Sequence, residues 1–274
     1  MKKYYNYNGR FFSEDQRVLS PDDRSYRYGD GLFETMKIAG GKILLEEYHF
    51  ERLFSGLQIL KFEVPAQFTK QKMSEQIGEL CKKNCCEESA RVRLSVSRGS
   101  GGLFDCDNKL NYLIESSPLD PIGLNENGLI IDIFPDVRKG IDILSNLKSA
   151  NYLPYVMAAI WAKENRLNEA LILNQHGRIC DATIANVFWI KGGQVFTPPL
   201  NEGCVGGVMR KNILNTNNQI QEKRLTENEL ATADEVFLTN ATNGIRWVQR
   251  FRDKSYENKI TRYLFTQIVQ TISP

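Results

Sequence analysis

The sequence predicts two domains of mixed α+β and α/β structure, for three reasons. Its 274 residues are enough for two cores, and its apolar share of 42% and charged share of 25% are ordinary for a soluble globular protein. Segments in which apolar residues alternate are interspersed with segments in which they recur at helical spacing. A stretch rich in Pro and Gly, Ser116–Gly128, separates two halves. We therefore expect domains at 1–118 and 128–274, joined by a linker at 119–127.

The first half alternates between strand and helix patterns. "KYYNYNGRFF" and "GLFETMKIAGGKILLEE" alternate as strands do, and the second is predicted to be a hairpin that turns at Gly40 and Gly41. A helix is predicted where apolar residues recur from Phe50 to Leu60, and another from about Thr69 to Asn84. "ARVRLSV" and "LNYLIESSPL" are predicted to be strands.

The second half is predicted to be richer in sheet. Strand patterns occur in "LIIDIFPDV", "EALILN", "VFWIK", "QVFTPP" and "ADEVFLTN". Helices are expected from Tyr152 to about Asn165, in "GVMRKNILNTNN" and near the C-terminus. This larger domain would also contain Lys148, which directly precedes the first of these helices.

Charge and composition exclude several classes of function. A formal net charge of +2 and the lack of a basic cluster argue against nucleic acid or an anionic membrane as partners. The N-terminus lacks the apolar run of a secretory signal, and no apolar stretch approaches the ~20 residues of a membrane span. We expect a cytoplasmic protein whose six cysteines are reduced thiols. Cys81, Cys85 and Cys86 lie far in sequence from His49 and His176, so we expect no metal site.

Five sequence blocks occur in one order and suggest a family. They are "YRYGDGLFET", "YHFERL", "LKSANYL", "GRICDATIANVFW" and "EGCVGGVMRKNIL". Together they resemble the class IV pyridoxal-phosphate enzymes, which include branched-chain aminotransferases, D-amino acid aminotransferases and 4-amino-4-deoxychorismate lyase. The resemblance extends from about Tyr26 to Val248. It implies fold type IV, with a small N-terminal α/β domain and a larger C-terminal domain that carries the cofactor lysine, and a homodimer.

The resemblance implies roles for three charged residues. Lys148 would form the Schiff base with pyridoxal 5'-phosphate, because an amine can act first as nucleophile and then as proton shuttle. Asp181 would keep the ring nitrogen protonated, although the family usually has Glu there, so the carboxylate is one methylene shorter. Arg52 would bind the phosphate. Each residue alone has a simpler explanation: a solvated lysine, an aspartate that caps a turn, and an arginine paired with Glu47 or Glu51.

Further cofactor contacts follow from the same comparison. The backbone N–H groups of Val208 and Met209, at a helix start, would bind the phosphate. Ala241 stands where the family usually has a hydroxyl, so the backbone and Thr242 would serve in its place. Tyr152 would hydrogen-bond the ring oxygen of the cofactor or pack in the core, and Asn186 would orient the strand of Asp181.

The reaction is predicted to be that of 4-amino-4-deoxychorismate lyase, which releases pyruvate to give 4-aminobenzoate, a folate precursor. "SRGSGG" resembles the lyase branch, whereas "GGLFDCD" lacks the Arg-x-His pair of D-amino acid aminotransferases and "RVRLS" lacks the Arg-Pro of branched-chain enzymes. Tyr28, Arg93 and Arg98 would bind the substrate, and Thr35 would assist proton transfer; the arginines could instead lie on a solvated face. The alternatives are an aminotransferase that acts on branched-chain or other amino acids with 2-oxoglutarate, and a non-catalytic protein of the same fold.

Overall fold

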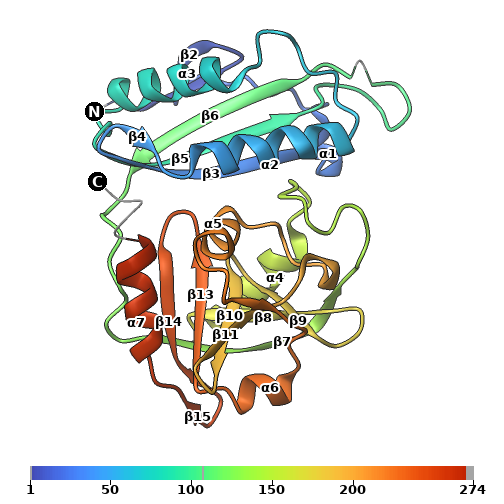
Figure 1. The fold of residues 1–274 in the computed structure, drawn as a ribbon. Coiled ribbons are helices and arrows are strands. Elements are labelled where there is room, and N and C mark those ends of the chain that lie inside the picture. The colour runs from blue at the N-terminus through green and yellow to red at the C-terminus, as the bar shows by residue number, and fades with distance from the viewer. Residues whose placement is uncertain (1, 107, 270–274) are drawn as a thin grey trace. The chain divides into compact units, whose positions relative to one another are not determined.

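The chain divides into two compact units in a computed structural model that describes residues 2–106 and 108–269 (Figure 1). The first unit comprises the residues up to Pro121 together with Leu147–Asn151, and the second comprises Ile122–Asn146 and the residues from Tyr152 onward. The sequence analysis places Lys148 in the C-terminal domain, whereas its segment packs with the first unit in the structure.

The first unit contains a six-stranded antiparallel sheet with the order β2-β1-β6-β5-β3-β4. Its strands are β1 (Tyr4–Tyr7), β2 (Arg10–Ser13), β3 (Gly31–Ala39), β4 (Lys42–Ile43), β5 (Ser89–Ser97) and β6 (Asn111–Pro118). The predicted hairpin is confirmed, because β3 and β4 are joined at Gly40 and Gly41, both of which have positive φ. Burial alternates along β5, so alternate side chains point to opposite faces of the sheet.

Two long helices of the first unit share one core with its sheet. The long helices are α2 (Glu46–Ile59) and α3 (Lys70–Lys83), and a short helix, α1 (Arg24–Tyr28), precedes β3. The helix predicted from Thr69 to Asn84 is confirmed: these two residues are its caps, and the Thr69 hydroxyl accepts a hydrogen bond from the Lys72 N–H at 3.2 Å. α2 packs on β3, and α3 packs on β1 and β6. Their buried side chains join those of β3, β5 and β6 in one apolar cluster.

The second unit contains a nine-stranded mixed sheet, in which β12-β11-β10-β13-β14-β7-β8-β9 are neighbours and β15 pairs with β14. Its strands are β7 (Leu129–Lys139), β8 (Glu169–Asn174), β9 (Ile179–Ala182), β10 (Asn186–Lys191), β11 (Gln194–Thr197), β12 (Gln221–Glu222), β13 (Glu235–Asn240), β14 (Gly244–Phe251) and β15 (Lys254–Ser255). The sheet curls, since the Ala182 N–H donates to the Ala185 carbonyl at 2.8 Å and brings β9 against β10. The sequence analysis did not predict β14, because a bulge between Val248 and Arg250 interrupts its alternation.

Helices cover parts of the second sheet. They are α4 (Leu153–Glu164), η1 (Leu200–Glu202), α5 (Val208–Thr216), α6 (Glu227–Ala231), α7 (Lys259–Leu264) and η2 (Phe265–Val269). The predicted helix from Tyr152 to Asn165 is confirmed as α4, with these residues as its caps and with Pro154 in its first turn. α4 packs on β7 and β8, and α5 packs on β13. Among the described residues, no helix combines the length and apolar character that a bilayer span requires.

Candidate functional site

The backbone of Lys148 is fixed to strand β3 of the first unit. The Phe33 N–H donates to the Lys148 carbonyl at 2.9 Å, and the Ala150 N–H donates to the Gly31 carbonyl at 2.9 Å. Leu32 and Ser149 form an antiparallel bridge between these two contacts. The segment therefore extends the sheet locally, which explains why it packs with the first unit.

The ring of Phe33 lies beside both Lys148 and Arg93. Lys148 Nζ is 4.5 Å from the ring centroid, and the central guanidinium carbon of Arg93 is 3.8 Å from it. Arg93 pairs with Thr35 across β5 and β3, so these two side chains lie on the same face of the sheet. The first unit therefore places two of the predicted active-site residues beside one aromatic ring, and Thr35 lies on the same face of the sheet as Arg93.

A buried carboxylate, Glu34, lies on the opposite face of β3 and binds Arg52. Arg52 Nε donates to Glu34 Oε1 at 2.8 Å, and Arg52 Nη2 donates to Oε2 at 2.5 Å. His49 Nδ1 is 2.6 Å from the same Oε2, and His49 Nε2 has no hydrogen-bond partner within the described chain. Burial would raise the pKa of Glu34, but the Arg52 charge and the His49 hydrogen bond lower it to about 2. The role of Arg52 toward phosphate stays a prediction.

Arg98 is held by the loops at the end of its strand. Its Nε donates to both carboxylate oxygens of Asp30, at 3.0 and 3.2 Å, and its Nη2 donates to the Leu60 carbonyl at 2.6 Å. Arg24 Nε also donates to Asp30, at 2.8 Å, and its guanidinium lies 5.3 Å from the ring of Tyr28, which is 45% exposed. These contacts hold the Arg98 side chain at the end of its strand, and its role toward the substrate stays a prediction.

Asp181 in the second unit is a buried acceptor for several donors. On Oδ2 it accepts hydrogen bonds from Lys139 Nζ at 2.9 Å, the Tyr155 hydroxyl at 2.8 Å and the Val205 N–H at 3.0 Å. On Oδ1 it accepts one from Asn186 Nδ2 at 3.1 Å. Sequence analysis anticipated Asn186 but missed Lys139 and Tyr155. Neither residue belongs to the motif around Asp181, and no local signal pointed to them.

Two turns beside Asn186 offer groups that suit a phosphate. Gly207 is the N-cap of α5 without any side-chain cap, so the first N–H groups of this helix, at Val208 and Met209, have no acceptor inside it. A Cβ at Gly207 would lie 1.8 Å from Asn186 Oδ1, so any larger residue there would displace the Asn186 side chain. Asn186 pairs with Thr239 across β10 and β13, and the buried Thr239 hydroxyl lacks a partner within the described chain.

The turn that follows Thr239 is ordered by one asparagine side chain. Asn240 Oδ1 accepts hydrogen bonds from the Thr242 N–H and hydroxyl, both at 3.1 Å, and from the Asn243 N–H at 2.8 Å. Ala241, at the tip, is half-buried. The unpartnered Thr239 hydroxyl and the N–H groups of α5 fit a ligand with several acceptor oxygens, as a phosphate has.

Tyr152 lies against the Asp181 cluster. Its ring stacks on Tyr155 with centroids 4.2 Å apart, and its hydroxyl donates to the Thr183 carbonyl at 3.3 Å. Asp181, Asn186 and Tyr152, which the sequence analysis assigned to the cofactor ring, are thus linked through Tyr155 and the adjoining turn in the second unit.

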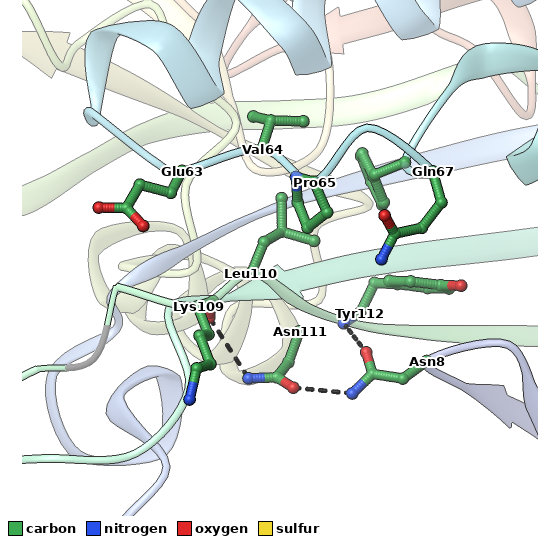
Figure 2. A pocket seen from close by; sticks show the side chains of 10 residues that line it. Asn8, Glu63, Val64, Pro65, Gln67, Lys109, Leu110, Asn111 and Tyr112 are labelled. Atoms are coloured by element: carbon green, nitrogen blue, oxygen red, sulfur yellow. Dashed lines mark hydrogen bonds between the residues drawn. The ribbon is translucent and has the colours of Figure 1, made fainter.

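A separate groove lies on the first unit (Figure 2). It has a volume of about 710 Å³ and lies where the β1–β2 turn, the loop after α2 and the start of β6 meet. Figure 2 shows Asn8 at this place, where its amide bonds Asn111 at 2.7 Å. No predicted site residue lines this groove. It is therefore distinct from the residues around Lys148.

Comparisons with known proteins agree on one family. The model of the amino-transferase class IV family matches residues 31–251. An aminodeoxychorismate lyase of Bacillus subtilis is 32% identical over 85% of this chain and 82% of its own length. A putative branched-chain-amino-acid aminotransferase of Methanocaldococcus jannaschii is 30% identical over 94% of this chain and 91% of its own. The structure of a branched-chain amino acid aminotransferase of Escherichia coli has a TM-score of 0.89 at 20% identity, covering 100% and 95% of the two chains.

Proposed function

Because this chain belongs to the class IV aminotransferase family of pyridoxal-phosphate-dependent enzymes, we propose that it is a 4-amino-4-deoxychorismate lyase. The substrate would be amino-deoxychorismate, and the products 4-aminobenzoate and pyruvate. When bound, pyridoxal 5'-phosphate supplies an aldehyde for the substrate amine and a ring that withdraws electrons from the neighbouring carbon. The α5 N-terminus, Asn186 and Asp181 would hold it in the second unit, and Lys148 would hold it covalently.

Two residues of the first unit would move protons. Once the substrate amine has displaced it, Lys148 Nζ would take the proton from the carbon that carries that amine. Thr35 would deliver a proton to the enolpyruvyl group, whose bond to the ring breaks and which departs as pyruvate while the ring becomes aromatic. The backbone of Lys148 is hydrogen-bonded to β3, the strand that carries Thr35, and β3 pairs with β5. Both proton-transfer groups are therefore attached to one rigid sheet.

The position of Arg93 is the observation that carries this proposal. Amino-deoxychorismate has two carboxylates, and a guanidinium can bind a carboxylate through two parallel hydrogen bonds. Arg93 and Lys148 both contact the Phe33 ring, so Arg93 would hold a substrate carboxylate near the reacting amine. The lyase relative from Bacillus subtilis and the "SRGSGG" loop support the same reaction.

An aminotransferase is the second candidate. The relative from Methanocaldococcus jannaschii, which aligns over 94% of this chain, favours it. Both reactions begin with removal of the proton from the carbon that carries the amine. In the lyase, the bond between the substrate ring and the enolpyruvyl group then breaks. In the aminotransferase, a proton is instead added at another carbon. The family assignment argues against a non-catalytic protein.

A product assay without a keto acid separates the two reactions. The lyase should release 4-aminobenzoate and pyruvate from amino-deoxychorismate when no amino acceptor is added. An aminotransferase should instead convert leucine or another amino acid only when 2-oxoglutarate is present. Transamination of leucine together with no aminobenzoate would overturn the lyase proposal.

Replacement of the amine at position 148 tests either reaction. We expect Lys148→Ala to lower turnover by roughly a thousandfold or more, because it removes both the covalent attachment and the proton shuttle. The visible absorption of the bound cofactor should also shift to that of the free aldehyde. Lys42→Ala, on the exposed β3–β4 hairpin, is the control and should change neither property. Unchanged colour and turnover in Lys148→Ala would contradict the assignment.

We also propose that the protein is a homodimer. The outward residues of α4 are apolar at helical spacing, namely Leu153, Val156, Met157 and Ile160, and each is at least 43% exposed. Since the opposite side of α4 is buried on its own sheet, the helix is apolar on both sides from Leu153 to Ile160, and its outward side needs a second cover. A second copy of the chain would supply it, and light scattering after size-exclusion chromatography should give twice the mass of one chain. A monomer would contradict this.

A further inference from the structure

Asp181 is held by donors from several elements of the second unit. Asp181 is 1% exposed on β9, and its donors come from the end of β7, from α4, from β10 and from the turn before α5. The family resemblance leads one to expect Glu here, which would reach one methylene further. A shorter carboxylate needs tighter support to point at the same place.

The donors are distributed unequally between the two carboxylate oxygens. Oδ2 accepts from Lys139 Nζ at 2.9 Å, the Tyr155 hydroxyl at 2.8 Å and the Val205 N–H at 3.0 Å. Oδ1 accepts from Asn186 Nδ2 at 3.1 Å and only distantly from the Val205 N–H, at 3.3 Å. A carboxylate has about four lone-pair positions in all. Among the described residues, Oδ2 is therefore saturated, and Oδ1 has room for one more donor.

The Tyr155 hydroxyl acts as a hydrogen-bond donor to Asp181 at every pH at which it keeps its proton. It is 6% exposed, and its ring stacks on Tyr152 at an interplanar angle of 18°. Burial, followed by the neighbouring Asp181 charge, raises the pKa of Tyr155 well above its usual value, so the hydroxyl keeps its proton. Lys139 Nζ lies 5.4 Å from the centroid of the same ring, so the phenol and the ammonium approach Oδ2 together.

We propose that Tyr155 is a positioning residue that, with Lys139, fixes Oδ2 of Asp181 and so leaves Oδ1 for the protonated ring nitrogen of the cofactor. This arrangement is how the chain uses Asp in the place of Glu. The inference rests on the proposed function, because it assigns Asp181 to the cofactor ring. It adds a residue of α4 that lies outside the motif of Asp181.

A pair of matched tyrosine variants tests this proposal. Tyr155→Phe removes one hydroxyl that bonds Asp181, and Tyr256→Phe removes one that bonds the Leu230 carbonyl, also at 2.8 Å. Both tyrosines are buried in the second unit, at 6% and 7% exposure. We expect Tyr155→Phe to weaken binding of pyridoxal 5'-phosphate by about tenfold, measured by absorbance titration of the apoprotein, and Tyr256→Phe to leave it unchanged.

A pH titration of the bound cofactor gives a second readout that is independent of turnover. When the ring nitrogen of the cofactor carries a proton, its positive charge makes protonation of the bound Lys148 Nζ less favourable. When Asp181 is held less firmly, the pH at which the bound Nζ loses its proton should therefore rise, by about one unit. Tyr256→Phe should not move this midpoint. A purely structural role for Tyr155 would instead lower the melting temperature and leave the midpoint in place.

Lys139→Met is a second variant that tests the same proposal if Tyr155→Phe fails to fold. It removes the charged donor from the same oxygen while retaining the apolar stem, and we expect the same direction of change in cofactor affinity and in the midpoint. A yellow wild-type protein whose affinity and midpoint survive both substitutions would overturn this inference alone. A wild-type protein that never binds the cofactor would overturn the proposed function and this inference with it.

Discussion

The two units bury a carboxylate in opposite ways. Glu34 in the first unit is 1% exposed and contacts Arg52 and His49 directly, and its pKa falls to about 2. Glu169 in the second unit is 4% exposed, and its Oε2 has no hydrogen-bond partner in the described part of the chain. Burial raises the pKa of Glu169 to about 7, against the weaker opposing effect of Arg246.

This difference shows that burial alone does not fix the charge of an acid. Removal of water disfavours the charged form of both groups, and the net direction depends on whether a cation is in contact. Glu34 is therefore charged at neutral pH and stabilises the fold there. Glu169 binds a proton more tightly in the folded state than in the unfolded state, so its contribution is present at acidic pH and lost as the pH rises.

The largest effect is expected from Glu34→Gln. Removal of the carboxylate leaves the half-buried Arg52 charge without this partner, which should lower the free energy of unfolding at neutral pH by about 3 to 5 kcal/mol. Because the pKa of Glu34 is lowered from 4.5, its stabilisation is complete above about pH 4.5 and declines as the pH falls toward 2. Urea denaturation followed by circular dichroism at several pH values measures this loss.

An exposed glutamate on the same sheet provides the control for Glu34→Gln. Glu115→Gln, on β6, should change the free energy of unfolding by less than about 0.5 kcal/mol. If Glu34→Gln cost no more than this control at pH 7, the ion pair with Arg52 would not stabilise the first unit.

Glu169→Gln should have the opposite effect. A folded pKa of about 7 against 4.5 in the unfolded chain means that stability is full below about pH 4.5 and is lost as the pH rises through 7. The neutral amide avoids this loss, so the variant should be more stable than wild type by about 3 kcal/mol above pH 8 and nearly equal at pH 4.

Tryptophan fluorescence measures the unfolding of the second unit alone and so tests this prediction. Trp161, Trp189 and Trp247 are the three tryptophans of the chain, and all belong to that unit. Glu126→Gln, on the exposed loop before β7, is the matched control and should show no pH-dependent difference. Equal stability of wild type and Glu169→Gln at both pH values would show that Glu169 ionises normally.

Sequence analysis found the residues that belong to local motifs and missed those that only the fold brings together. Arg52 lies one helix turn after His49 in the block "YHFERL", and the apolar spacing around them predicts a helix. Their positions could therefore be predicted from the sequence. Lys139 and Tyr155 reach Asp181 from 42 and 26 positions away, and no period or motif connects them. The partner of Arg52, Glu34, was missed for the same reason, since only the packing of α2 on β3 joins them.

The smallest effect is expected from Arg246→Gln. Arg246 is half-buried on β14, and its charge lowers the pKa of Glu169 only in part. Its removal should raise that pKa further and destabilise the second unit by about 1 kcal/mol at pH 8, with little effect at pH 5, where Glu169 already carries its proton. Combined with Glu169→Gln, the pH-dependent part of this loss should vanish, because no charge remains for Arg246 to attract. A loss that persists in the double variant would mean that Arg246 stabilises the second unit through its packing and that another group sets the pKa of Glu169.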